Sequence, residues 1–177
     1  GCGVATPQEA ESAASETSQW VTYREGTPVL PDPSVFDAAP QSARQAAAEL
    51  VDWQNEHFAG TYVREEDSVV VIVATDDLGA ALAEDEFTRF GEAVAIERSA
   101  HSSREINLLA DRLIKAVPGF GEDFQVWGAN YTGTGLKVEV GASPLEDERT
   151  AIETFAEQHR LPIEVYVIEG ESNLTLD

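Results

Sequence analysis

From residue 40 onward, apolar positions follow helical and strand spacing in turn. After Pro40, a favoured first helical residue, apolar and aromatic side chains recur every three or four positions, which predicts a helix. Its expected inner face is formed by Ala43, Ala46, Ala47, Leu50, Trp53 and His57. We expect strands over 58–63, 69–73 and 93–96, and a capped helix from 75 to 90. The unbroken apolar run 69–73 indicates a strand that is buried on both faces or lies at the centre of its sheet.

The second half of the chain repeats that order of elements. It predicts a helix opened by a capping box at 102–105, strands over 124–131 and 136–140 around a hairpin turn, a helix capped at Ser143, and a strand over 161–168. Each half reads helix, strand, turn, strand, helix, strand. We therefore predict an α+β fold of two tandem αββαβ units, each a small antiparallel or mixed sheet with helices packed on one face.

This pattern divides the chain into four parts. The first lobe is expected at 40–101 and the second at 102–177. Residues 20–39 combine three prolines with apolar side chains, which favours an extended arm lying on the globular part. Residues 1–19 are rich in Ser, Thr, Glu and Ala, and cannot bury enough apolar surface to offset the entropy of ordering. We expect them to be a disordered tether.

The only cysteine of the chain is Cys2, in a Gly-Cys-Gly sequence directly before the tether. This arrangement resembles the processed N-terminus of bacterial lipoproteins, in which the lipobox ends in Gly-Cys and the thiol carries the lipid. A single thiol cannot form an internal disulfide and is too few for a structural zinc site. We expect Cys2 to be lipidated and to hold the protein outside the cell membrane, the alternative being a free terminal cysteine.

The charge of the chain restricts its partners. The formal net charge is −22, from 33 acidic and 11 basic residues, and it is spread along the whole chain. Such a surface repels phosphate backbones, which excludes nucleic acid as a partner. Lysine is scarce relative to arginine, a bias found in GC-rich genomes and in salt-adapted proteins. We expect an actinobacterial envelope protein, or else a secreted protein of a halophile.

No catalytic or metal-binding motif is found in the sequence. There is no Gly-x-Ser-x-Gly elbow of a serine hydrolase and no Asp-x-Asp-x-Asp-Gly calcium loop. Adjacent side chains on a helix point in different directions, so the runs of acidic residues do not form a convergent pair of carboxylates. His57, His101 and His159 are expected on the surface or near helix ends. We expect most of the aromatic residues to pack in the core: Trp53, Trp127, Phe87, Phe90, Phe120 and Phe155. The sequence predicts no catalytic residue, no metal and no cofactor.

A hydrophobic rhythm with an aromatic-Ala-Gly strand opening runs through 58–62 into 68–71, and through 94–99 to Glu105, Ile106 and Leu109. These segments resemble the pro-regions of secreted serine proteases of the alpha-lytic protease and streptogrisin type, within a similarity that covers roughly 40–170. The resemblance implies a two-lobed α/β structure that acts as folding catalyst and inhibitor of a protease. It also implies a C-terminal tail that lies in the protease active site, here within 171–177. The implied binding residues are Asn173, Leu174, Thr175, Leu176 and Asp177.

Together these features predict a lipid-anchored envelope protein that is not an enzyme and binds another protein. An extracellular serine protease is the sharper expectation for that partner. The alternative is a receptor lipoprotein for a small molecule or an ion, with its site between the lobes. An enzyme that uses two carboxylates is a third interpretation, and it requires two carboxyl groups that converge in one pocket.

Overall fold

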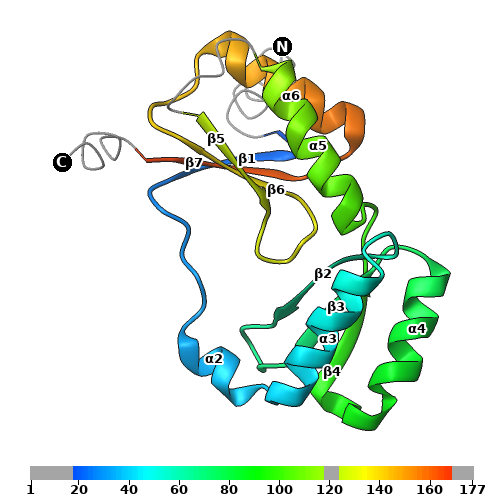
Figure 1. Ribbon diagram of the computed structural model, residues 1–177. Coiled ribbons are helices and arrows are strands. Elements are labelled where there is room, and N and C mark those ends of the chain that lie inside the picture. The colour runs from blue at the N-terminus through cyan, green and yellow to red at the C-terminus, as the bar shows by residue number, and fades with distance from the viewer. Residues whose placement is uncertain (1–17, 118–123, 169–177) are drawn as a thin grey trace, which may run out of the picture.

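The computed structural model describes residues 18–117 and 124–168, and within them it shows a mixed α+β fold. Seven strands form a three-stranded and a four-stranded sheet, and helices pack against both (Figure 1). The predicted fold class is therefore confirmed.

The first sheet contains β2 (Phe58–Val63), β3 (Val70–Ala74) and β4 (Val94–Arg98), in the order β2-β3-β4. Strand β2 is antiparallel to β3, and β3 is parallel to β4. The helices are α3 (Gln41–Trp53) and α4 (Asp77–Phe87), the second followed by the 3₁₀ helix η1 (Thr88–Ala93). The helices and one face of the sheet bury a common apolar core that includes Ala43, Ala47, Phe58, Ile72 and Phe87.

The second sheet has the same arrangement of its equivalent strands. These are β5 (Phe124–Ala129), antiparallel to β6 (Leu136–Val140), which is parallel to β7 (Ile163–Val167). The helices are α5 (Ser103–Ala116) and α6 (Glu146–His159). In both units a phenylalanine opens the first strand and pairs with the last residue of the second strand, Phe58 with Ala74 and Phe124 with Val140.

The segment before the first lobe is not simply extended. Residues Val21–Glu25 form strand β1, which pairs in parallel with β7 and extends the second sheet to the order β1-β7-β6-β5. Residues Pro33–Ala38 form the short helix α2, because Asp32 caps it and Pro33 fits its first turn. The expected extended arm over 20–39 therefore agrees with β1, whose backbone is extended and pairs with the second sheet, but not with α2, which is helical. Strand β1, near the start of the described chain, therefore forms an edge of the sheet beside β7, which lies near the end of the described chain.

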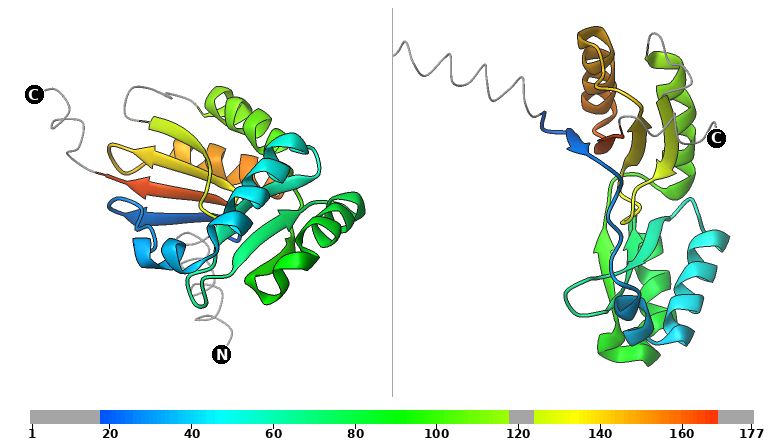
Figure 2. Two further views of the ribbon diagram at one scale, coloured as in Figure 1. Left: turned by 60° about the horizontal axis from the view of Figure 1, so that its bottom comes forward. Right: turned by 90° about the vertical axis from the view of Figure 1, so that its left-hand side faces the viewer.

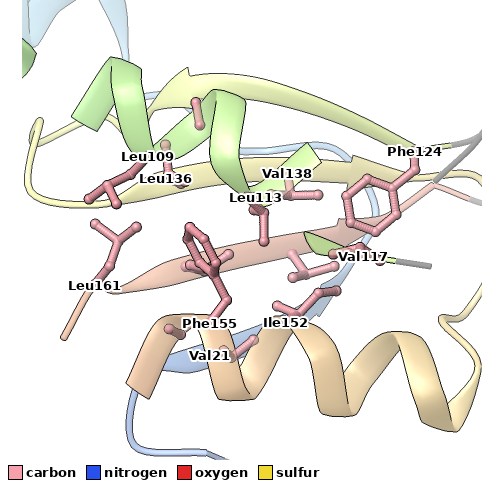
Figure 3. Close-up of a cluster of buried hydrophobic side chains, with 14 of the residues drawn as sticks. Val21, Leu109, Leu113, Val117, Phe124, Leu136, Val138, Ile152, Phe155 and Leu161 are labelled. Carbon is pink, nitrogen blue, oxygen red and sulfur yellow. The ribbon is translucent and has the colours of Figure 1, made fainter. Parts of the chain in front are cut away.

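The core of the second lobe lies between its sheet and the helices α5 and α6. Alternate strand residues point into it, as Figure 3 shows for Leu136 and Val138 opposite Leu113, Ile152 and Phe155. Residues Ile163, Val165 and Val167 share that face, as the sequence predicts. The intervening residues of β6 and β7 are only half-buried, so they lie on the face that the helices leave uncovered.

Two of the predicted helix starts have different outcomes. At α5 the Ser102 hydroxyl accepts the Glu105 backbone N–H at 3.2 Å, so half of the expected capping box is present. At α6 the predicted cap Ser143 is wrong, because the helix begins at Glu146. There the Glu148 carboxylate accepts the Leu145 N–H at 2.7 Å. This bond is the reciprocal half of a capping box, in which the N3 carboxylate accepts from the N-cap N–H.

The two lobes meet where the β5–β6 turn reaches the first sheet. The Tyr131 hydroxyl donates to the Val63 carbonyl at 2.7 Å, and the Tyr131 ring lies edge-on to Tyr62 with centroids 5.7 Å apart. A Cβ added to Gly133 would lie 2.8 Å from the Ala59 carbonyl oxygen, so the two backbones are in direct contact. The turn therefore packs on β2 and connects the two lobes.

Candidate protein-binding surface

Among residues 18–117 and 124–168, no helix packs on one face of the second sheet, and we call this face the open face. Figure 2 (left) shows its four strands side by side, with β1 and β5 at the two edges. Because side chains alternate along a strand, the residues between the core positions project here. They are Thr22, Arg24, Gln125, Trp127, Lys137, Glu139, Glu164 and Tyr166.

Trp127 is the most prominent side chain of the open face. The register of β5 against β6 shifts between Val126 and Gly128, so Trp127 occupies a bulge, a feature that redirects side chains. It is 58% exposed, and its ring lies 5.3 Å from the ammonium nitrogen of Lys137. This cation–π contact holds a large apolar ring at the surface.

The charges of the open face differ from those of the chain as a whole. Arg24 and Lys137 are accompanied by Glu139 and Glu164, so the face carries as many cations as carboxylates, whereas the chain has a net charge of −22. Neither Arg24 nor Lys137 forms a salt bridge within residues 18–117 and 124–168. Both cations are therefore available to acceptor groups of a partner.

Tyr166 completes the open face between Arg24 and Glu139 in the strand register. Its hydroxyl donates to a Glu164 carboxylate oxygen at 3.3 Å. Burial raises the pKa of Tyr166, and the neighbouring charge of Glu164 raises it further. The phenol therefore stays protonated at neutral pH and is a donor.

The histidines have structural contacts. The His57 Nδ1 atom lies 2.6 Å from Asp76 Oδ2, and Asp76 Oδ1 accepts the Gly79 N–H at 2.8 Å, which caps α4. The bond from Gly79 and then the bond to His57 lower the pKa of Asp76. His57 thus fixes the start of α4, although it follows α3 in sequence.

The other two histidines lie at the ends of the second lobe's helices. His101 is buried, with Nδ1 2.8 Å from Glu105 Oε1 and Nε2 3.2 Å from the Arg160 carbonyl oxygen. It links the start of α5 to the end of α6, so it lies near a helix end as expected, with its side chain buried. His159 is the last residue of α6 and packs on Phe155, with ring centroids 4.5 Å apart. The described residues contain no group of three or more His, Cys, Asp or Glu side chains that fits a metal ion.

The site residues expected from the sequence are not among those of the open face. Cys2 and the tail residues Asn173, Leu174, Thr175, Leu176 and Asp177 lie outside the described part of the chain, as does Phe120. None of the helices within the described ranges is long and apolar enough to cross a bilayer.

Two of the six aromatic residues considered for the core are not part of it: Trp127 and Trp53 are 58% and 85% exposed. The sequence indicates the open face through the alternation of apolar and charged residues over Leu136–Val140, which is typical of a strand with one solvent-exposed face. Nothing comparable marked Arg24, because the strand that carries it was not predicted.

Comparison with known proteins gives no relative: the chain matches no protein-family model, no curated protein and no solved structure.

Proposed function

We propose that this protein is a non-enzymatic protein-binding module of a bacterial cell envelope, held on the membrane by a lipid on Cys2. The open face is its partner-binding surface. The observation that carries this proposal is the exposed Trp127, stacked with Lys137 on a sheet face that also presents Tyr166 and Arg24. Tryptophan, tyrosine and arginine are the residue types that contribute most to protein–protein binding energy.

An exposed sheet face favours a macromolecule over a small ligand. Small molecules bind in concave sites that cover most of their surface. A protein partner instead binds over a broad area, about 800 Å² on each side in a stable complex. The balanced charges of the open face also avoid the repulsion that the rest of this acidic surface imposes on most proteins.

The experiment that tests the binding surface is site-specific photo-crosslinking in native membranes. A benzophenone amino acid replaces Trp127 in one variant and Leu108 in another, since Leu108 is 53% exposed on α5, away from the open face. We expect a discrete crosslinked partner at position 127 that is absent at position 108. Identical crosslinking patterns at the two positions, or none at 127, would contradict the proposal.

The serine protease version of the proposal is tested separately. Purified protein in large excess is added to a streptogrisin-type protease, and the full chain is compared with a chain that ends at residue 170. We expect inhibition by the full chain that is weakened when the tail is removed. Full protease activity in both cases contradicts this version and leaves the crosslinking test of the open face unaffected.

Lipidation is tested on Cys2 itself. Cells expressing the unprocessed protein are labelled with an alkynyl fatty acid, and the Cys2→Ser variant is the control. We expect label and membrane association in the parent and loss of both in the variant. An unlabelled parent protein in the soluble fraction would show that the anchor is wrong.

A further inference from the structure

The first lobe also carries an exposed tryptophan, and this one lies on a helix rather than on the face of a sheet. Trp53 ends α3 and is 85% exposed, which is unusual for the largest apolar side chain. It borders a shallow groove with a volume of about 260 Å³ between α3 and the end of α4. Ala46, Leu50 and Trp53 recur at helical spacing along α3 and give the groove an apolar stripe.

The polar groups of the groove are acidic. Glu49 and Glu86 are both in its lining, together with Arg89. Arg89 is already engaged, because it donates to Glu86 at 2.9 Å and its guanidinium lies 4.7 Å from the Phe90 ring centroid. Glu49 accepts from the neutral amide of Gln45, at 3.3 Å, and forms no salt bridge within the described chain. The groove therefore has an unneutralised carboxylate next to an exposed indole ring.

We propose that this groove binds a lysine or arginine side chain of a polypeptide partner, with its methylene stem on Ala46 and Leu50 and its charge between the Trp53 ring and Glu49. An indole face attracts cations, and a carboxylate adds direct charge pairing. The volume is below the 300–1,000 Å³ that is usual for small-molecule pockets, which favours one side chain over a metabolite. The long apolar stems of lysine and arginine match the apolar stripe.

Charge complementarity supports this occupant over an apolar one. Helices α3 and α4 also carry Asp52, Glu84 and Asp85 in addition to the lining carboxylates. A cationic segment is attracted to this region, whereas an acidic one is repelled. The groove and the open face lie on different lobes, so each proposal can fail without the other.

The test is a titration followed by nuclear magnetic resonance. The probe is a nine-residue alanine- and serine-based peptide with one central lysine, and its partner peptide has norleucine at that position. The protein has three tryptophans, so Trp53 gives one of three indole N–H signals. We expect the lysine peptide to shift the Trp53 signal saturably and the norleucine peptide to shift it far less. Signals of Trp20 and Trp127 should stay in place.

Substitutions define the contribution of each group. We expect Trp53→Ala to weaken binding of the lysine peptide by about 3- to 30-fold, the range of a cation–π contact. Glu49→Gln should weaken binding, while Glu157→Gln, which removes the same charge from the exposed side of α6, should not. Because Trp53 and Glu49 are exposed, the variants should fold, which circular dichroism checks.

Three results would overturn the proposal. Equal shifts with lysine and norleucine would show a purely apolar groove. Equal weakening by Glu49→Gln and Glu157→Gln would show diffuse attraction to an acidic protein. An unmoved Trp53 signal would show that the groove does not bind such a side chain.

Discussion

The contact between the lobes gives the sharpest test of the structure, through Gly133→Ala. Gly133 has a φ of +77°, and a Cβ there would lie 2.8 Å from the Ala59 carbonyl oxygen and 3.1 Å from the Gly60 Cα. The turn cannot easily move back, because Asn130 Oδ1 accepts from the Thr134 N–H at 3.0 Å and from the following N–H. The substitution therefore strains the backbone and also pushes the lobes apart.

A matched control separates these two costs. Gly26 has a φ of +82°, and a Cβ there would have nothing within 4 Å. Gly26→Ala therefore carries the cost of a left-handed alanine alone, about 1–2 kcal/mol. Gly133→Ala adds an overpacking cost of about 1–3 kcal/mol against the backbone of β2. The loss of chain entropy in the unfolded state is similar for both substitutions and cancels in their difference.

The assay is urea unfolding of both variants and the parent, followed by far-UV circular dichroism and by tryptophan fluorescence. We expect Gly133→Ala to lower the free energy of unfolding by about 1–3 kcal/mol more than Gly26→Ala. Values within about 0.5 kcal/mol of each other, the usual range of neutral surface changes, would refute the close contact of the two lobes.

Three further results follow from the contacts of the folded chain. Tyr131→Phe removes the hydrogen bond between the lobes and should lower the free energy of unfolding by about 1 kcal/mol, measured by the same urea assay. Leu136→Ala should cost about 2–5 kcal/mol because Leu136 is fully buried, whereas the exposed Leu145→Ala should stay within about 0.5 kcal/mol of the parent. Because the fold lowers the pKa of Asp76 below its ordinary value of 3.8, the ionised carboxylate stabilises the fold at pH values above 3.8. This stabilisation is lost as the pH falls through the pKa of Asp76 in the folded state. Asp76→Asn should therefore show a smaller decrease in thermal stability than the parent on acidification below about pH 4, and an equal decrease would contradict the role of Asp76.

The order of elements could be predicted because each element has a local signal. The 3.6-residue spacing of Ile106, Leu109 and Leu113 marks α5 without reference to the rest of the chain, and all three are buried. Strand β1 has no such signal, since it is short and is stabilised by pairing with β7 at the far end of the chain. The alternation of buried and exposed residues over 21–25 is interpretable only once that partner is known.

The exposure of the two tryptophans has a related reason. Trp53 falls on the helical spacing of α3, but it is the last residue of the helix and is 85% exposed. Trp127 directly follows Val126, which packs on the core, so it projects from the opposite face of β5, at the point where the bulge shifts the register. Apolar character alone therefore does not tell whether a side chain at a helix end or beside a bulge is buried.

The two lobes share one strand topology but differ in the side chains that β3 and β6 present on the face away from the helices. The pairing registers make Val71 and Val73 of β3 equivalent to Lys137 and Glu139 of β6. In the first sheet these positions are apolar and fully buried, next to the β2 edge against which the 130–135 turn packs. In the second sheet the same positions are charged, so burying that face would require desolvating both charges. The second lobe therefore contributes a turn that packs on the first lobe, while its own charged face stays exposed in the described chain.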